Sequence, residues 1–428
     1  MDIVSKIYKE GRYMSTPKKD VLEQVYGKDI ENAIARFEHI DASFQKNFPG
    51  MGEAEFFTAP GRTEIIGNHT DHNGGRVIAG SINLDTIGAA VKSDDDVIEV
   101  ISEGYQKVVV DLKKLSEVKK EAGTLSLVAG MAEAMQNMGY EIHGFKLYAT
   151  TTVIAAAGVS SSASFEMLIC AIVNYFYNDN KIPVGDYARI GQYSENHWWN
   201  KASGLMDQMA CAVGGPIKLD FAGEIAYEKI PFGFDTYGYK MVITNTGKGH
   251  ADLSDDYSAV PNEMFAVAKA LGVERLCQTD MQTLLSNLSK VLEEVGNDRA
   301  VLRAMHFLNE TERVAYMAKA VEDKDFERIL SLIKASGESS YDLLQNCYTN
   351  SNWKEQKIAL ALALTKEFLS KKGSGVCRVH GGGFAGVIQC ILPEEDCDAY
   401  VDYMAGFFGK ENVYPMNIRQ IGAVHLAR

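Results

Sequence analysis

Residues 67–75, GNHTDHNGG, bring two histidines, one aspartate and two asparagines together between glycines. Each of these side chains offers hydrogen-bond donors or acceptors in a fixed direction, which suits a ligand rich in hydroxyl groups. A zinc site made of His69, Asp71 and His72 is an alternative. The spacing of a strand followed by a turn does not favour convergence of the two imidazoles, and no H-E-x-x-H helix supports them. A polar turn without a ligand is the third interpretation.

A second stretch, AAAGVSSSASFEM, has the composition of an anion site. Small residues precede three serines at the start of a predicted helix, so backbone N–H groups at the positive end of the helix dipole could bind phosphate. The stretch is not a Walker loop, because G-x-x-x-x-G-K-[ST] is absent. Simple capping of the helix by Ser160, Ser161 or Ser162 is the alternative interpretation.

A third stretch, VHGGGFAG, contains the glycines 381–383. Three successive glycines permit a backbone path that is closed to residues with a Cβ atom. The stretch therefore predicts either a tight turn or a close approach of the backbone to a ligand.

The elements that must position these stretches alternate irregularly between helix and strand. The chain before about residue 60 is expected to be helical. VIEVIS and KVVVDL should form a hairpin, and FKLYATTTV and YKMVITNTG should form strands. GVSSSASFEMLICAIVNYF predicts a long helix, and residues 262–369 should be mostly helical. This pattern predicts an α+β chain of two domains, residues 1–238 and 239–428.

The composition limits the partners of the chain. Its 428 residues are 46% hydrophobic, and 57 acidic residues against 43 basic ones give a formal net charge of −14, which argues against nucleic acid as a partner. Seven scattered cysteines fit neither a disulfide framework nor a zinc ribbon. The charged start has no signal-peptide pattern and no apolar run is long enough for a membrane span, so no membrane partner and a cytoplasmic location are expected.

The three stretches together resemble the motifs of galactokinases, which belong to the GHMP kinase superfamily. Residues from about 60 onward are similar to the signature G-R-x-N-x-I-G-E-H-x-D-Y-x-x-G, then to the phosphate loop P-x-G-x-G-L-S-S-S-A, and then to T-G-G-G-F-G-G. The order and spacing also match. The resemblance implies a two-domain GHMP-kinase-like fold with the active site in the cleft between the domains. It also implies ATP-dependent phosphorylation of the anomeric hydroxyl of D-galactose, which gives α-D-galactose 1-phosphate.

The resemblance also implies roles for individual residues. GLMDQ matches the family pattern that carries the catalytic aspartate, here Asp207, and the signature arginine, Arg62, would lie beside it. A carboxylate there could accept the proton of the anomeric hydroxyl, and a guanidinium would keep that carboxylate ionised. The substrate-binding residues implied for the sugar are Arg62, Asn68, His69, Asp71, Asp207 and Tyr257.

The expected cofactors are ATP and Mg²⁺, with a small-molecule sugar and a nucleotide as the partners of a monomer or weak homo-oligomer. The family's metal ligands fall on Ser162 and Glu195, a hydroxyl and a carboxylate that suit this hard cation. The residues implied to hold the phosphates are Ala156, Ala157, Gly158, Val159, Ser160, Ser161 and Ser162.

The chain departs from the family pattern at positions that concern specificity. The family's signature asparagine is Glu64 here, its glutamate is Asn68 and its tyrosine is His72. The family's glutamate faces the 6-hydroxyl of the sugar, whereas an amide would also tolerate a carboxylate at C6. A kinase for galacturonate or N-acetylgalactosamine is therefore an alternative.

The aromatic pattern W-x-x-Y-V-x-G, typical of the family's adenine side, is replaced by TLSLVAG, so the sequence does not identify a pocket for the base. Two further alternatives belong to other functional classes. One is a sugar sensor without activity, although Ser162, Ala163 and Asp207 are kept where such sensors lose the serine–alanine pair. The other is a metal hydrolase that uses His69 and His72.

Overall fold

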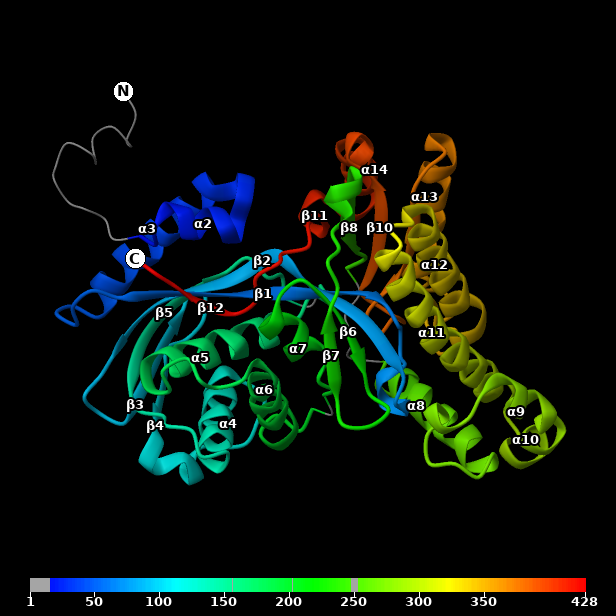
Figure 1. Ribbon diagram of the computed structural model, residues 1–428, viewed down its shortest axis with the longest axis horizontal. Coiled ribbons are helices and arrows are strands. Elements are labelled where there is room, and N and C mark those ends of the chain that lie inside the picture. Colours follow the sequence, from blue (N-terminus) through cyan, green and yellow to red (C-terminus); the bar gives the residue numbers. More distant parts are fainter. Residues whose placement is uncertain (1–15, 156, 202, 248–252) are drawn as a thin grey trace.

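The computed structural model describes residues 16–155, 157–201, 203–247 and 253–428, and these residues form two sheets that lie next to each other (Figure 1). The first sheet has eight strands in the order β12-β1-β2-β5-β3-β4, with β6 paired to β2 and β7 to β6. Its strands are β1 (Glu55–Ile66), β2 (Arg76–Lys92), β3 (Val97–Ser102), β4 (Val108–Asp111), β5 (Phe145–Thr151), β6 (Pro216–Asp220), β7 (Ala226–Lys229) and β12 (Val424–Leu426).

Helices cover both faces of the first sheet (Figure 1). Because both faces are covered, the apolar residues of β1 are buried along nearly its whole length. One face carries α2 (Lys19–Tyr26) and α3 (Ile30–Asn47), whose apolar stripe of Ala33, Phe37, Ile40 and Phe44 has the three- to four-residue spacing of a helix. The other face carries α4 (Thr124–Asn137), α5 (Ser161–Tyr177), α6 (Val184–His197) and α7 (Met206–Val213).

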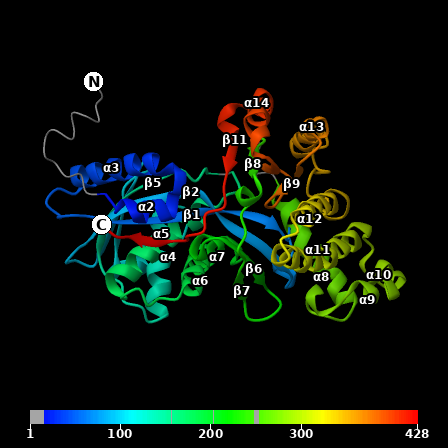
Figure 2. The ribbon, with the colours of Figure 1, turned by 45° about the horizontal axis from the view of Figure 1, so that its top comes forward.

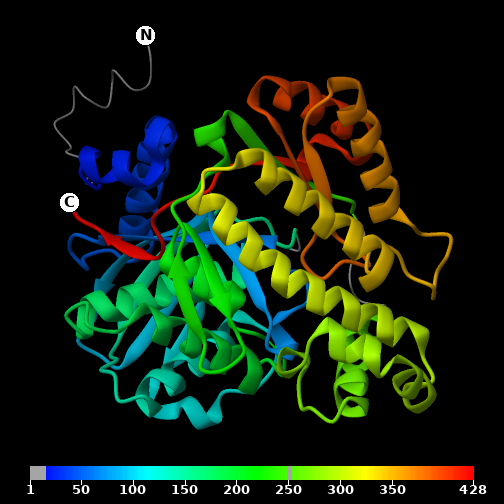
Figure 3. The same ribbon diagram turned by 45° about the vertical axis from the view of Figure 1, so that its right-hand side comes forward.

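The second sheet is antiparallel, in the order β11-β8-β10-β9. Helices α11 and α12 pack on one of its faces and α13 and α14 on the other, and Figure 3 brings α11 and α12 to the front. The strands are β8 (Tyr239–Asn245), β9 (Val376–His380), β10 (Val387–Pro393) and β11 (Val413–Met416). The helices are α8 (Ser254–Ala270), α9 (Met281–Ser286), α10 (Leu288–Val295), α11 (Asp298–Glu322), α12 (Phe326–Ser339), α13 (Lys357–Lys372) and α14 (Cys397–Phe408).

The two sheets share contacts that the sequence did not suggest. One core cluster contains residues of the first sheet, such as Ile66 and Ile78, together with residues of the second, such as Ile243 and Ile391. The last strand, β12, returns to pair with β1, and Figure 2 shows it beside that strand. A domain boundary between residues 238 and 239 stays a prediction. Strand β12 belongs to the first sheet, although it comes from the predicted second domain.

Most of the predicted elements near the candidate site are present. The hairpin is formed by β3 and β4, FKLYATT is β5, and the three serines lead into α5. TLSLVAG forms the start of α4. Within the described residues, no helix has both the length and the apolar character that crossing a membrane requires.

Candidate active site

At Gly61, strand β1 lies very close to the predicted phosphate loop, residues 157–162. A Cβ atom at Gly61 would lie 2.7 Å from the carbonyl oxygen of Val159, so only glycine fits there. The backbone N–H of Arg62 donates to the same oxygen at 3.1 Å. The pairing of β1 with β2 shifts register on both sides of Arg62, as bulges next to active sites commonly do. The strand therefore delivers the Arg62 side chain to the loop.

Arg62 and Asp207 form a bidentate ion pair, although 145 positions separate them in the sequence. Asp207 lies in the first turn of α7. Arg62 Nε donates to Asp207 Oδ1 at 2.7 Å, and Arg62 Nη2 donates to Asp207 Oδ2 at 2.8 Å. Arg62 Nη1 also donates to the carbonyl of Gly158, and the Ser160 hydroxyl donates to Asp207 Oδ2. The predicted neighbours are thus brought together by direct bonds.

These contacts decide the charge of Asp207. Burial by itself raises the pKa of this carboxyl, but the positive charge of Arg62 and the hydrogen bonds from Arg62 and Ser160 outweigh it and hold the pKa below its ordinary value. Asp207 is therefore ionised at neutral pH, as a carboxylate that accepts a proton must be.

The serines of the phosphate loop do not act as caps. Ser160 precedes α5 with a φ of 58°, and its side chain makes no capping bond to the helix. Ser162 Oγ instead donates to Glu195 Oε1 at 2.9 Å. The capping interpretation is therefore wrong for Ser160 and does not describe the Ser162 contact. Ala157, Gly158, Val159 and Ser161 complete the described part of the loop, and Ala156 lies outside the described residues.

Ser162 and Glu195 fit a Mg²⁺ ion in the chemistry of their donors. They supply one hydroxyl and one carboxylate in contact, and Mg²⁺ usually takes only one or two protein ligands while keeping waters and phosphate oxygens. Among residues 16–155, 157–201, 203–247 and 253–428, no group of three or more His, Cys, Asp or Glu residues is placed to hold a metal ion. Mg²⁺ bound by Ser162 and Glu195 would therefore need further ligands from phosphate oxygens and water.

A buried polar layer behind Glu195 was not foreseen from the sequence. Gln208 Nε2 donates to Glu195 Oε2 at 3.3 Å and to Glu166 Oε2 at 3.2 Å. Burial, and then the charge of Glu195, raise the pKa of Glu166 well above its ordinary value. Gln208 follows Asp207 directly in GLMDQ, which is the only signal that the sequence carried for this layer.

On the sugar side, several predicted residues bond to the glycine loop. Asn68 Nδ2 donates to Gly381 O at 2.7 Å, and His69 Nε2 donates to Gly382 O at 2.8 Å. The hydroxyl of Tyr257 donates to Gly383 O at 2.7 Å. Successive carbonyls of residues 381–383 thus receive bonds from residues 67–75, here called the signature loop, and from α8. These contacts hold residues 67–75 and the glycine loop together.

Glu64 and Asn68, which exchange the family's asparagine and glutamate, are partners. Asn68 is 1% exposed, and its Nδ2 also donates to Glu64 Oε1 at 3.1 Å. Arg378 of β9 neutralises Glu64 with a buried contact of 2.6 Å, and Asn346 Nδ2 donates to Asn68 Oδ1 at 2.8 Å. The two departures from the family pattern are therefore one coupled change. A direct role of Asn68 in sugar binding stays a prediction.

Asp71 differs from its neighbours because its carboxylate accepts no hydrogen bond from any part of the chain that the structure describes. One of its oxygens approaches Gly204, where a Cβ atom would lie 2.9 Å from Asp71 Oδ2. His72 has a buried Nε2 with no partner in the same described part, and burial lowers its pKa to about 4. The ring centres of His69 and His72 lie 6.0 Å apart, and His69 Nε2 faces a carbonyl, which does not favour a zinc site.

A cavity of about 310 Å³ adjoins the loop serines, and the sequence did not predict it. It joins residues from the β3–β4 hairpin, α4, α5 and the segment after α6, and no fixed spacing connects these in the sequence. Three aromatic side chains contribute to it, which is typical of a site for a flat ring. Its lining is Thr86, Ser102, Tyr105, Thr124, Leu127, Thr151, Ser161, Ser162, Phe165 and Trp199.

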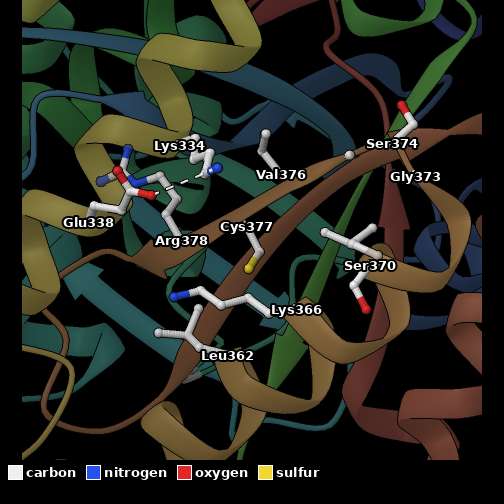
Figure 4. A pocket seen from close by; sticks show the side chains of 13 residues that line it. Lys334, Glu338, Leu362, Lys366, Ser370, Gly373, Ser374, Val376, Cys377 and Arg378 are labelled. Carbon is white, nitrogen blue, oxygen red and sulfur yellow. Dashed lines mark ion pairs between the residues drawn. The ribbon is translucent and has the colours of Figure 1, made fainter.

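A second cavity, of about 430 Å³, lies between α12, α13 and β9, away from the predicted residues (Figure 4). Lys334 and Glu338 form an ion pair of 3.9 Å at its edge, and Cys377 lies in its wall. Arg378, which binds Glu64, also contributes to this wall. None of the predicted site residues lines the cavity.

Known proteins are similar to this chain over most of its length. Residues 42–92 match a family profile described as the galactokinase galactose-binding signature, and residues 126–215 match one described as the GHMP kinases N terminal domain. The galactokinase of Lactococcus lactis subsp. lactis strain IL1403 is 30% identical over 408 residues, which cover 92% of this chain and 97% of that protein. The chain belongs to the galactokinase family.

Other galactokinases agree with this assignment. The galactokinase of Limosilactobacillus fermentum strain NBRC 3956 is 31% identical over 367 residues, which cover 83% of this chain and 89% of that protein. The crystal structure of L. lactis galactokinase complexed with galactose is similar with a TM-score of 0.78 at 25% identity, and covers 91% of this chain and 99% of that one. The predicted fold class is confirmed, and the chain is a sugar kinase.

Proposed function

We propose that this galactokinase-family chain transfers the γ-phosphoryl group of ATP to the anomeric hydroxyl of D-galactose and releases α-D-galactose 1-phosphate. The observation that supports this most strongly is the ionised Asp207, which accepts hydrogen bonds from Arg62 and from Ser160 just before α5. Phosphoryl transfer needs little covalent help from the protein, so a positioned carboxylate and charge neutralisation are the parts to expect.

In this proposal, Asp207 accepts the proton of the anomeric hydroxyl while that oxygen attacks phosphorus. Arg62 keeps the carboxylate ionised and its charge stabilises the transferring group. The backbone N–H groups at the start of α5, around Ser161 and Ser162, would bind the phosphates. Ser162 and Glu195 would hold Mg²⁺, which neutralises the phosphate charge when it is bound. The cavity beside Ser162 is the proposed place of the base, with Tyr105 and Trp199 as aromatic contacts.

The residues near the signature loop favour galactose over galacturonate. A uronate carboxylate would need a positive partner, and Arg76 is the cation closest in sequence to the loop. Arg76 Nε already binds Asp220 Oδ2 at 2.8 Å, and Arg378 is already bound to Glu64. Asp71, whose carboxylate accepts no hydrogen bond from the described chain, is the proposed acceptor for sugar hydroxyls.

ADP release tests this proposal. The chain would be supplied with Mg-ATP and one of galactose, galacturonate, N-acetylgalactosamine or glucose, with a reaction lacking sugar as the control. We expect the highest kcat/KM with galactose, and we expect release to stop when a chelator removes Mg²⁺. If kcat/KM were higher with galacturonate or N-acetylgalactosamine, that sugar and not galactose would be the preferred substrate. Release that does not depend on any sugar would overturn the kinase proposal.

A further inference from the structure

Lys201 places a positive charge on the proposed metal ligands. Its Nζ lies 2.7 Å from Glu195 Oε1, the same oxygen that accepts the Ser162 hydroxyl at 2.9 Å. The Lys201 side chain is 51% exposed, whereas that of Glu195 is almost fully buried. A cation from the protein therefore stands where the proposal places Mg²⁺.

The main chain holds Lys201 in this position. Its backbone N–H donates to the carbonyl of Glu195 at 3.0 Å, just beyond the end of α6. Two residues later, the N–H of Ser203 donates to Asn196 Oδ1 at 2.7 Å. Lys201 and Ser203 are thus both bonded back to residues of α6. Ion pairs between exposed side chains contribute little, but this one has a buried carboxylate and an anchored backbone.

The charge of a nucleotide supplies a reason for the lysine. A triphosphate brings several negative charges to the start of α5, and Arg62 is already bound to Asp207 and to Gly158 O. Trp199, two residues before Lys201, lines the cavity together with Ser162. The Lys201 ammonium and the Ser162 hydroxyl bond to the same oxygen, Glu195 Oε1, so a flexible lysine side chain could turn from this oxygen toward phosphates bound beside Ser162.

We propose that Lys201 is a phosphate-binding residue of the nucleotide site that shares Glu195 with the metal. Without Mg²⁺ the ammonium neutralises Glu195 and binds the phosphates of the nucleotide. When the metal takes Glu195, the ammonium is displaced and the metal carries most of the phosphate charge. The inference rests on the proposed function in one respect, because it takes a nucleotide to bind beside Ser162.

The test compares the affinity for ADP, measured by titration calorimetry, in chelator and at saturating Mg²⁺. The ratio of the two dissociation constants measures how much Mg²⁺ strengthens ADP binding. Lys201→Met should weaken binding in chelator by about 10- to 100-fold, the usual value of a charged hydrogen bond, and weaken it far less with Mg²⁺. The dissociation constant in chelator divided by that at saturating Mg²⁺ should therefore rise by more than about fivefold. Lys201→Arg, which keeps the charge, should leave the ratio within about threefold of the wild type.

Lys181→Met is the matched control, because Lys181 is exposed and pairs with Asp179 at a distance of 3.0 Å outside the site. It should leave the ratio unchanged. A merely structural role of Lys201 would weaken binding equally in both conditions and would not move the ratio. An unchanged ratio in Lys201→Met, or a wild-type chain that binds no ADP in chelator, would overturn the inference. Normal ADP binding without phosphorylation of any sugar would overturn the proposed function and leave Lys201 as a phosphate ligand.

Discussion

On the proposed phosphoryl-transfer side of the candidate site, the side chains of Arg62 and Ser160 both donate hydrogen bonds to the Asp207 carboxylate. On the sugar side, Asn68 and His69 donate instead to the backbone carbonyls of the glycine loop, which lies more than 300 residues further along the chain. Charged groups that leave water require a charged partner, so the first arrangement is fixed by ion pairing. The second depends on how closely the two halves of the chain approach each other.

The comparison teaches where activity and specificity should respond to substitution. A change on the phosphoryl side should alter the chemical step, because its side chains carry the charge that the reaction uses. A change at Asn68 should alter stability first, because its amide is bonded inside the protein. Asp71 is the exception on the sugar side, since its carboxylate accepts no bond from the described chain.

The largest effect is expected for Asp207→Asn. An amide cannot accept the anomeric proton, so kcat should fall by about 10²–10⁴, the usual scale for a positioned base. Rates of ADP release with galactose measure this loss, and thermal unfolding checks that the variant is folded. Activity within tenfold of the wild type would remove Asp207 from the proton transfer.

The next largest effect is expected where Glu64 and Asn68 meet. Asn68→Glu would place a second carboxylate against Glu64 in a buried site, and should lower the free energy of unfolding in urea by roughly 3 kcal/mol. The double variant Glu64→Asn/Asn68→Glu exchanges the two groups and should recover at least half of this loss. If the losses of the single variants Glu64→Asn and Asn68→Glu simply added in the double variant, the two side chains would not be energetically coupled.

A smaller effect is expected for Asp71→Asn, and it should appear in binding. Loss of a charged acceptor for sugar hydroxyls should raise KM for galactose by about 10- to 100-fold, with a smaller change in kcat. Asp94→Asn, on an exposed turn between β2 and β3, is the control with the same chemical change. A KM that stays at the wild-type value would mean that the sugar does not use Asp71.

The effect that is smallest near neutral pH, because it develops only in acid, concerns His306, whose Nε2 lies 2.9 Å from the carbonyl oxygen of Asn68. Burial lowers the pKa of His306 to about 4, below the value of about 6.5 expected in the unfolded chain. As pH falls from about 6.5 to 4, the unfolded chain binds a proton that the folded one does not, and stability declines. His306→Asn should reduce this decline by about 1.4 kcal/mol per pH unit, measured by urea unfolding at several pH values. Identical slopes would contradict the assignment.

The sequence predicted the phosphoryl side better than the rest of the site, for a physical reason. Its contacts join short motifs, so once Arg62 and Asp207 were matched to a family pattern, their proximity followed, whereas the bond from Ser160 to Asp207 was not predicted. The pairing of Glu64 with Asn68 was missed because each departure was considered alone, and a burial pattern cannot show that two changed residues touch. Lys201 was missed because it contacts Glu195 through a turn beyond a helix end, where no periodic spacing applies.

The fold was predicted in its elements and less well in its assembly. Strands such as β3, β4 and β5 follow from alternation, and α5 follows from its apolar run. The return of β12 to β1 could not be read from a three-residue strand. The cavity lined by Tyr105, Phe165 and Trp199 depends on tertiary packing of segments that have no common motif.

The most direct test of the central claim is the position of the new phosphate ester. The chain would be incubated with Mg-ATP and galactose labelled with ¹³C at C1, and the product examined by ³¹P and ¹³C magnetic resonance. The account predicts one sugar phosphate whose phosphorus couples to the labelled carbon in the α configuration, and predicts that Asp207→Asn forms it at least a hundredfold more slowly. A phosphate at another carbon, or ATP hydrolysis without a sugar phosphate, would contradict the account.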